Sequence, residues 1–427
     1  MTPPLEPDRT TGYRLIDELH RHLGIAKNPL YAHISIGDSA NLDAFSRLRT
    51  ASAKTTFDTK LTHDNEPEFW EESQVSGAGT GSFYSIDRAS VAIYVSNGTI
   101  GKRVRQTYAR PNYQPGKSQM ILMTCIMGGS GSGIIRETGQ FDDENGLFFR
   151  NDGGTMKVVR KTHVTGSAVD NEVAQSSWNI DTFDGNGNSG ITLDFTKTQI
   201  FVIDYQWLGV GRVRFGFDID GVIYYCHEML HANNLDAVYM STPNNPLRYS
   251  VENNGTGAFA DLECICSCVI SEGGQEATGT DYWYSTEGTH VNANVAGNVY
   301  AVLGVQLTDG HRGEDVDIHS MNMLTETNDN YEWMIYKNPT VGGTFTYNTA
   351  AYGPFDVAKG ATSNTITAGD QIAGGFGSKG SSIGSDIDFE GSFGESINGT
   401  KDTFVLAVRP LGANADIQGG MILRVNH

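Results

Sequence analysis

Basic residues are scarce in this sequence. Its 427 residues include 30 Lys and Arg against 50 Asp and Glu, which gives a formal net charge of -20 at pH 7. Proteins that recognise phosphate backbones or anionic lipids do so through clusters of Lys and Arg. The composition therefore argues against a nucleic-acid partner and against docking to an anionic membrane. It suits an exposed surface on which like charges oppose aggregation.

Long apolar runs and spaced cysteine pairs are also missing. No apolar run reaches the ~18 residues that a transmembrane helix needs, so we expect no membrane insertion. The first residues have neither the basic nor the apolar stretch of a secretory signal peptide, and we expect none. The five cysteines do not indicate a disulfide framework. Three of them, Cys264, Cys266 and Cys268, alternate along one apolar segment and are predicted to line one buried face of a strand.

Glycine, by contrast, is abundant, with 51 residues among many Asn, Asp, Ser and Thr. Turn-forming residues in this number, between short apolar segments, indicate many short strands. The clearest hairpin is predicted at Asp220-Gly221, between Val213–Ile219 and Val222–His227. Asp-Gly supplies the two positive-φ positions of a type I′ turn. Asn151-Asp-Gly-Gly154 predicts a second hairpin.

These strands predict an all-β protein in three parts. Residues 76–275 are predicted to form a β-sandwich or jelly-roll body. A glycine-rich break at Ser271–Thr280 separates this body from a second β-rich domain, residues 276–427. Within that domain, Gly374–Ser385 is nearly low-complexity and is expected to be a long loop. Residues 1–75 are expected to form a short N-terminal helix followed by an extended arm.

The N-terminal part contains the one convincing helical pattern. Tyr13–Leu23 places leucines at helical spacing, and Gly24 can end the helix. The resulting apolar stripe fits packing on its own chain as well as docking on a neighbouring subunit. From about Asn41 to Gln74 the chain is polar with isolated apolar residues, as in arms that tie subunits together. The residues expected to make these assembly contacts are Leu15, Leu19, Leu23, Phe45, Arg47, Leu48, Arg49, Phe57 and Trp70.

One string matches a catalytic motif, His227-Glu-Met-Leu-His231. In zinc peptidases the motif H-E-x-x-H lies on a helix, where both histidines reach one metal. Here it continues a predicted strand, which would separate the two histidines by roughly 13 Å. We therefore predict no zinc site, and stoichiometric zinc that is lost in His227→Ala would contradict this. No other metal site, cofactor or catalytic residue is predicted, and the chain is not expected to be an enzyme.

Two further features have competing interpretations. Asp181–Asn188 is loosely similar to a calcium loop but lacks the spacing and closing Glu of an EF-hand, so we expect a solvated acidic loop. Trp283 and Trp333 lie in aromatic segments, Asp281–Tyr284 and Tyr331–Trp333. Both tryptophans are candidates for stacking on sugar rings. Both are equally compatible with positions in a core or a subunit interface.

Several segments resemble, in order, a group of bacteriophage virion structural proteins. The resemblance begins at Asp43-Ala-Phe-Ser-Arg-Leu-Arg49, the D-A-F-x-R-L-R segment, followed by Thr55-Thr-Phe-Asp-Thr-Lys60. It continues through Tyr113–Gln119, Gly139–Phe149 and Gln206–Gly216, and covers roughly residues 41–275. It implies a lectin-like β-sandwich body and a virion component without assigned catalytic residues. A lectin-like shape does not by itself imply sugar binding.

The sequence therefore leads us to expect a non-enzymatic structural protein displayed on a phage virion, as capsid decoration, at a vertex, or on the tail or fibre. Its partners would be other capsid or tail proteins and further copies of itself, with a trimer as the first expectation. The alternative is an adhesin or receptor-binding protein of the virion that recognises a host surface glycan.

Deleting residues 1–60 is expected to leave a soluble β body that no longer incorporates into particles, because the deletion removes the docking arm. Incorporation is measured by immunoblotting purified particles. Normal incorporation of the truncated protein would contradict the attachment role of this segment.

Overall fold

The structure is a computed structural model. It describes residues 6–8, 12–14, 42–45, 53–276, 278–311, 313–327, 329–379, 382–387, 393–412 and 414–426. The chain divides into two compact units, Met1–Asn41 and Leu42–His427. Among the described residues, no helix has the length and apolar character that crossing a membrane requires.

In the described residues of the first unit, β1 (Glu6–Asp8) and β2 (Gly12–Arg14) form an antiparallel pair with Pro7 opposite Tyr13. Tyr13 was expected to begin a helix, and its position in a strand contradicts that expectation. The rest of the expected helix, with Leu15, Leu19 and Leu23, lies outside the described residues.

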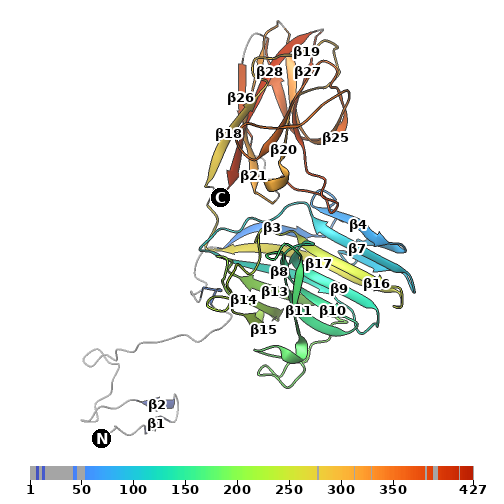
Figure 1. The fold of residues 1–427 in the computed structure, drawn as a ribbon, viewed down its shortest axis with the longest axis vertical. Helices are drawn as coiled ribbons and strands as arrows, with labels where there is room; N and C mark the ends of the chain where they lie inside the picture. Colours follow the sequence, from blue (N-terminus) through green and yellow to red (C-terminus); the bar gives the residue numbers. More distant parts are fainter. Residues whose placement is uncertain are drawn as a thin grey trace, which may run out of the picture. The chain divides into compact units, whose positions relative to one another are not determined.

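The second unit begins with a β-sandwich (Figure 1). Its first sheet consists of β4 (Trp70–Gly77), β7 (Ile100–Thr107), β9 (Ile134–Phe141), β10 (Gly146–Asp152), β11 (Thr155–Thr162), β12 (Val169–Ala174) and β16 (Leu247–Asn254). The described strands are ordered β12-β11-β10-β9-β16-β7-β4. A short 3-10 turn, η1 (Gln175–Ser177), follows β12.

The facing sheet consists of β3 (Lys54–Lys60), β5 (Thr80–Ser85), β6 (Ser90–Val95), β8 (Ser118–Ile126), β13 (Gln199–Tyr205), β14 (Val213–Ile219), β15 (Val222–Met229) and β17 (Ala260–Glu272). Its order is β15-β14-β13-β8-β17-β6-β5, with β3 paired beside β17. The two apolar inner faces form one core that includes Phe149, Phe201, Phe215 and Phe217. Alternating apolar residues in these strands produce that core because successive side chains point to opposite faces.

Both predicted hairpins are confirmed. Asp220 and Gly221 have φ of 55° and 81° and connect β14 to β15 with Ile219 opposite Val222. Positive φ at both central residues is the signature of a type I′ turn. The turn between β10 and β11 is formed by two glycines at positive φ, Gly153 and Gly154.

A second sandwich follows. Its smaller sheet consists of β18 (Gly279–Ser285), β19 (Val291–Ala293), β21 (Val316–Thr325), β26 (Ser382–Asp386) and β28 (Ala415–Asn426), ordered β18-β28-β21-β26 with β19 on β28. The facing sheet consists of β20 (Tyr300–Leu307), β22 (Tyr331–Val341), β23 (Asn348–Thr349), β24 (Phe355–Lys359), β25 (Ile366–Gly377) and β27 (Phe404–Pro410), ordered β23-β24-β20-β27-β22-β25. A 3-10 turn, η2 (Asp309–His311), follows β20.

The second sandwich has a core of its own, which includes Leu303, Ile318, Leu406 and Leu423. The all-β prediction is therefore confirmed. The predicted boundary at residue 275 falls in the connection between β17 and β18.

The long loop predicted at Gly374–Ser385 is wrong. Its first residues complete β25, which pairs with β22, and its last residues form most of β26, which pairs with β21. Glycine weakens a strand through entropy but does not prevent cross-strand hydrogen bonding. Here the partner strands supply the packing that the glycines lack: Gly377 lies against the ring of Tyr331 and Gly375 against that of Trp333.

The arm does not extend to residue 75, because β3 and β4 are strands of the first sandwich. Trp70 is 4% exposed in its core, and Phe57 packs against that core. The Trp70 indole donates a hydrogen bond to the Thr59 hydroxyl at 3.3 Å, and its ring lies 5.7 Å from that of Tyr249 between centroids. Phe57 and Trp70 were expected to contact another subunit. Trp70 instead belongs to the core of its own chain, and the half-buried Phe57 packs against that core.

The segment Leu42–Ala44 also packs against its own chain. The Leu42 carbonyl accepts a hydrogen bond from the Arg214 guanidinium at 2.7 Å, and the Ala44 amide donates to the Ser118 hydroxyl at 3.4 Å. All three residues of the segment are buried. The start of the D-A-F segment is therefore part of the body.

The hydrogen bonds of Leu42 and Ala44 connect this segment to a buried ion pair. Arg214 and Asp204 are fully buried and 2.5 Å apart. Asp204 also accepts hydrogen bonds from the Tyr225 hydroxyl at 2.7 Å and the Ser118 hydroxyl at 3.0 Å. Removing one member of a buried, hydrogen-bonded ion pair costs about 3–5 kcal/mol, since the other charge is left without compensation. The Leu42 carbonyl belongs to this hydrogen-bonding set.

The single cysteine face predicted for β17 is wrong. The pairing of β17 with β8 shifts register between Cys264 and Cys266, so Ile265 is an extra residue in the strand. A bulge residue of this kind reverses the inward and outward alternation. Cys264 consequently lies in the core, whereas Cys266 is exposed and Ser267 is buried.

Because Leu42–Ala44 and β3 belong to the first sandwich, the effect of an N-terminal deletion depends on where the deletion ends. Deleting residues 1–41 should leave the stability of the body unchanged, since the body begins at Leu42. Deleting residues 1–60 should lower the free energy of unfolding by about 3–5 kcal/mol, because it leaves the buried Arg214 guanidinium without the Leu42 carbonyl and removes the Phe57 side chain that packs against the core. The expected fall in Tm is roughly 10 °C. Scanning calorimetry of both truncated proteins checks this, and equal Tm values would contradict it.

Candidate functional site

A cleft of about 530 Å³ opens along one edge of the second sandwich. It lies between β18, which is the edge strand of the smaller sheet, and β23, which is the edge strand of the facing sheet. Clefts of this volume are typical of small-molecule sites. The residues whose chemistry matters for binding are Trp283, Ser285, Glu287, Thr344, Thr346, Asn348, Tyr352 and Lys359.

Trp283 is the most prominent side chain of the cleft. It is 45% exposed, although its strand neighbour Tyr284 is buried in the core. Successive residues of β18 alternate, so Trp283 lies on the outer face of the smaller sheet. Its ring covers Gly420 on the adjacent strand β28, where a Cβ would lie 2.3 Å from Trp283 Cη2. The absence of a side chain at Gly420 therefore makes room for the indole.

Tyr352 supplies the second exposed aromatic ring, with 59% exposure. It stacks on Tyr284 at a centroid distance of 5.7 Å and an interplanar angle of 13°. The Tyr284 hydroxyl donates to the Tyr352 carbonyl at 2.6 Å, and the Tyr352 hydroxyl donates to the Trp283 carbonyl at 3.2 Å. These contacts fix the Tyr352 ring beside the edge strand that holds Trp283.

The rest of the cleft wall is polar. Threonine hydroxyls and the Asn348 amide come from the segment 344–349, all of them on exposed residues. A salt bridge joins Lys359 Nζ to Glu287 Oε2 at 2.5 Å. Aromatic faces beside neutral hydrogen-bonding groups suit a ligand with an apolar face and polar edges.

Trp333, the other tryptophan proposed for sugar stacking, is 5% exposed and belongs to the second core. That part of the prediction is wrong. Trp333 lies on β22, and its side chain is directed into the core between the two sheets, which covers it. Trp283 lies on an edge strand and faces outward.

The H-E-x-x-H string lies on a strand and the turn after it. His227 is in β15, and its Nδ1 accepts a hydrogen bond from the Asn179 amide at 3.2 Å. His231 follows the strand and stacks on Tyr239 at 4.2 Å, with its Nδ1 2.6 Å from the Gly211 carbonyl. Both rings are engaged in packing and hydrogen bonds within the first sandwich.

The loop Asp181–Asn188 is ordered by its own backbone. Asp181 is buried, and its two carboxylate oxygens accept hydrogen bonds from the amides of Phe183 at 2.8 Å and Ser189 at 2.7 Å. Asp184 accepts the amide of Asn186 at 3.0 Å, a bond that lowers its pKa. Among the described residues, no cluster of three potential metal ligands occurs.

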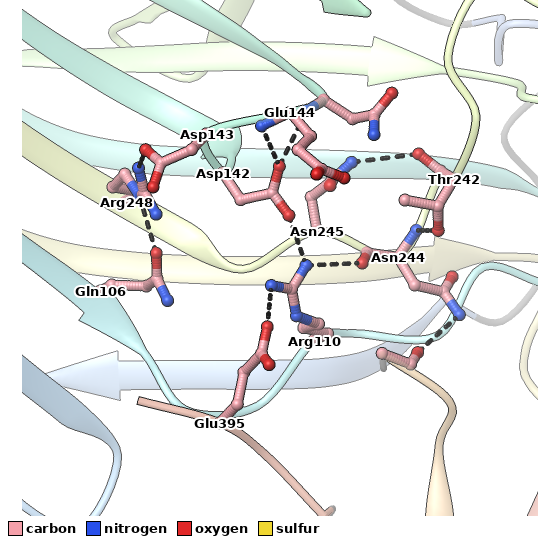
Figure 2. A network of polar contacts seen from close by, with 12 residues as sticks. Gln106, Arg110, Asp142, Asp143, Glu144, Thr242, Asn244, Asn245, Arg248 and Glu395 are labelled. Atoms are coloured by element: carbon pink, nitrogen blue, oxygen red, sulfur yellow. Dashed lines mark hydrogen bonds and ion pairs between the residues drawn. The ribbon is translucent and has the colours of Figure 1, made fainter. Parts of the chain in front are cut away.

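Figure 2 shows a polar network around Arg110. Its guanidinium donates to Asp142 at 2.7 Å and to Glu395 at 2.6 Å. Burial would lower the pKa of Arg110, but the two carboxylates outweigh it and raise the pKa. Burial would likewise raise the pKa of Asp142, and the Arg110 charge outweighs it and lowers the pKa. A general acid needs a raised pKa, so Asp142 is a poor candidate for that role.

Another acidic pair, Asp315 and Asp317, lies at the start of strand β21 of the second sandwich. Burial, followed by the charge of Asp317, raises the pKa of Asp315 to about 6. The Asn426 amide donates to both carboxylates, at 3.2 Å and 2.8 Å. Neither residue lines the cleft.

The remaining predicted assembly residues are only partly described. Phe45 is half-buried, and its amide donates to the Asp43 carboxylate at 2.9 Å. Arg47, Leu48 and Arg49 lie outside the described residues.

Sequence reasoning identified Trp283 but missed Tyr352, Lys359 and Glu287. Tyr352 and Lys359 are about 70 residues from Trp283 in the chain, and only the packing of β23 and β24 beside β18 brings them to it. The one local signal is the Gly-Pro pair of the segment Ala350-Ala-Tyr-Gly-Pro354, which predicts a turn but not a binding residue.

The site and the two cores define an all-β protein that carries a ligand-sized cleft on its second sandwich. No protein-family model and no curated protein matches the sequence. Among solved structures, the chain is similar to a legume lectin-like domain from Entamoeba histolytica, with 9% identity over 51% of this chain and 98% of that chain, and a TM-score of 0.30.

Two other solved structures are similar at the same level. One is the CBM2 module of the evolved Dit protein of Lactobacillus casei BL23 phage J-1, with 7% identity over 52% of this chain and 98% of that chain, and a TM-score of 0.33. The other is a glycosyl hydrolase family protein from Mycobacterium fortuitum, with 10% identity over 51% of this chain and 99% of that chain, and a TM-score of 0.34.

The two buried histidines predict a pH dependence of stability. Burial lowers the pKa of His227 and of His231 to about 4, against 6.5 for an ordinary histidine. Between these values the unfolded chain binds more protons than the folded chain, so stability is lost as the pH falls through this window. His231→Phe keeps a ring on Tyr239 and removes one titration. Its loss of stability between about pH 7 and about pH 5 should be roughly 2 kcal/mol smaller than that of the unchanged protein.

Chemical denaturation at the two pH values measures the difference. The raised pKa of Asp315 has the opposite effect, since it favours the folded state at low pH, but it acts equally in both proteins and cancels in the comparison. An identical pH dependence in His231→Phe would show that His231 is not held neutral by burial.

Proposed function

We propose that this protein is a non-enzymatic surface component of a phage particle and that it binds a glycan in the Trp283–Tyr352 cleft. The observation that supports glycan binding is the pairing of two exposed, fixed aromatic rings with a neutral hydroxyl and amide wall. A pyranose ring has an apolar C–H face that stacks on an aromatic ring, and hydroxyl edges that hydrogen-bond to such a wall. Nucleic acid would need Lys and Arg clusters, which this acidic chain lacks.

The absence of enzymatic activity is supported by the carboxylates of the cleft. Glycoside hydrolysis in most families needs two carboxyl groups on either side of the scissile bond. Glu287 is the one acidic residue among the described residues that line the cleft, and it is paired with Lys359. The arrangement favours binding without turnover.

The assignment to a virion rests on the resemblance that begins with the D-A-F-x-R-L-R segment. Because Leu42–Ala44 pack on their own sandwich, we propose that residues 1–41 are the part that attaches to other virion proteins. The two sandwiches would then be displayed, in an oligomer whose first expected form is a trimer. Immunoblotting of particles assembled with a protein lacking residues 1–41 tests this, since attachment should be lost while the body stays folded.

Replacing Trp283 with alanine tests the cleft. Loss of a central tryptophan typically costs about 2 kcal/mol of binding free energy, so Trp283→Ala should weaken glycan binding about thirtyfold. Binding of the full chain to a glycan array identifies the ligand, and calorimetry then gives the affinity of each variant.

Two further variants make the test specific. Phe376→Ala removes another exposed aromatic residue of the same sandwich, 69% exposed and outside the cleft, and should bind like the unchanged protein. Gly420→Ala leaves every binding group in place but puts a Cβ where the Trp283 ring lies, so it should weaken binding as well. Unchanged binding in both Trp283→Ala and Gly420→Ala would exclude this cleft as the glycan site.

A further inference from the structure

We infer that the cleft selects neutral glycans over acidic ones, because its one cationic side chain is neutralised by a carboxylate of the cleft itself. This inference rests on the proposed glycan binding and adds the class of sugar. Recognition of uronates or sialates needs a cation that can turn to the ligand carboxylate. The state of Lys359 therefore decides which class of glycan the cleft accepts.

Lys359 is the one cation among the described residues that line the cleft. It is the last residue of β24, and its ammonium lies 2.5 Å from the Glu287 carboxylate in the turn after β18. The two residues come from the two facing sheets, so the ion pair spans the cleft edge. A ligand carboxylate would meet a lysine whose charge Glu287 already compensates, and it would be repelled by the Glu287 carboxylate as it approached.

A cation on the strand next to that of Trp283 is also paired with a carboxylate. Arg424 on β28 donates two hydrogen bonds to Asp281, at 2.8 Å and 3.0 Å. Asp281 lies two residues before Trp283 on the same outward face of β18. Lys359 and Arg424 are therefore both matched by acidic partners.

The net charge of the whole chain also disfavours the binding of acidic glycans. With a formal net charge of -20, the surrounding field disfavours the approach of an anionic polysaccharide. A neutral sugar meets no such opposition, and the threonine hydroxyls and the Asn348 amide give it donors and acceptors without a change in charge.

The test compares pairs of oligosaccharides that differ only in a hexuronate in place of a neutral hexose. The full chain should bind the neutral member of each pair more tightly. Glu287→Gln releases Lys359 while keeping the size of the side chain, so it should raise the ratio of acidic to neutral affinity about two- to fivefold, the scale of an exposed ion pair. This gain should disappear in about 1 M salt, where exposed charge interactions are screened.

Glu332→Gln is the matched control. It removes the same charge from another ion pair of the second sandwich, Arg409–Glu332 at 2.6 Å, which lies outside the cleft. Its ratio of acidic to neutral affinity should stay that of the unchanged protein. An equal gain in Glu287→Gln and Glu332→Gln would attribute the effect to net charge and overturn the role of the Lys359–Glu287 pair.

The outcomes also separate this inference from the proposed function. Tight binding of acidic oligosaccharides by the unchanged protein, lost in Trp283→Ala, would overturn the neutral selectivity and leave the glycan site standing. Absence of binding to every oligosaccharide on the array would overturn both. Preference for the neutral members, reversed or reduced in Glu287→Gln, supports both.

Discussion

Each sandwich is held together by burial of the apolar faces of two sheets. The edge strands of these sheets keep unpaired backbone N–H and C=O groups that need other partners or solvent. In the first sandwich the edge strand β15 is covered: Asn179 exchanges hydrogen bonds with the backbone of Glu228, and the Ile180 amide bonds to Cys226. In the second sandwich the edges at β18 and β23 do not close on each other. The cleft is the space that remains between them, with Trp283 on the edge strand β18 and Tyr352 in the turn between β23 and β24.

The few basic residues of the chain are largely used inside the protein. Arg214 is fully buried against Asp204, Arg105 pairs with Glu72, and Arg110 joins Asp142 and Glu395. A buried guanidinium needs a paired carboxylate to offset its desolvation. An acidic chain with these cations engaged has a surface field that opposes the approach of anionic ligands, which connects the composition to the selectivity inferred for the cleft.

The errors of sequence reasoning have physical causes that can be named. Phe57 and Trp70 lie in a polar stretch and look like isolated anchors, but β3 and β4 find partners far away in the chain, at β17 and β7. The glycine-rich end of β25 becomes a strand because β22 holds it by cross-strand pairing. The bulge at Ile265 changes which cysteines face the core. The local sequence pattern does not predict a single extra residue in a strand.

The sequence by itself determined the all-β class, the hairpins at Asp220-Gly221 and Gly153-Gly154, and the position of the H-E-x-x-H string on a strand, because turn chemistry and period-two alternation are local properties. It also identified Trp283 and Trp333 as equivalent candidates for stacking on sugar rings. Only the tertiary structure decided between them, by placing Trp283 on an edge strand over Gly420 and Trp333 in the core between the two sheets. The same packing brought Tyr352, Lys359 and Glu287 to the cleft. The exposure of a side chain and the residues that surround it depend on which sheets face each other. Contacts between residues distant in the chain determine how the sheets face each other.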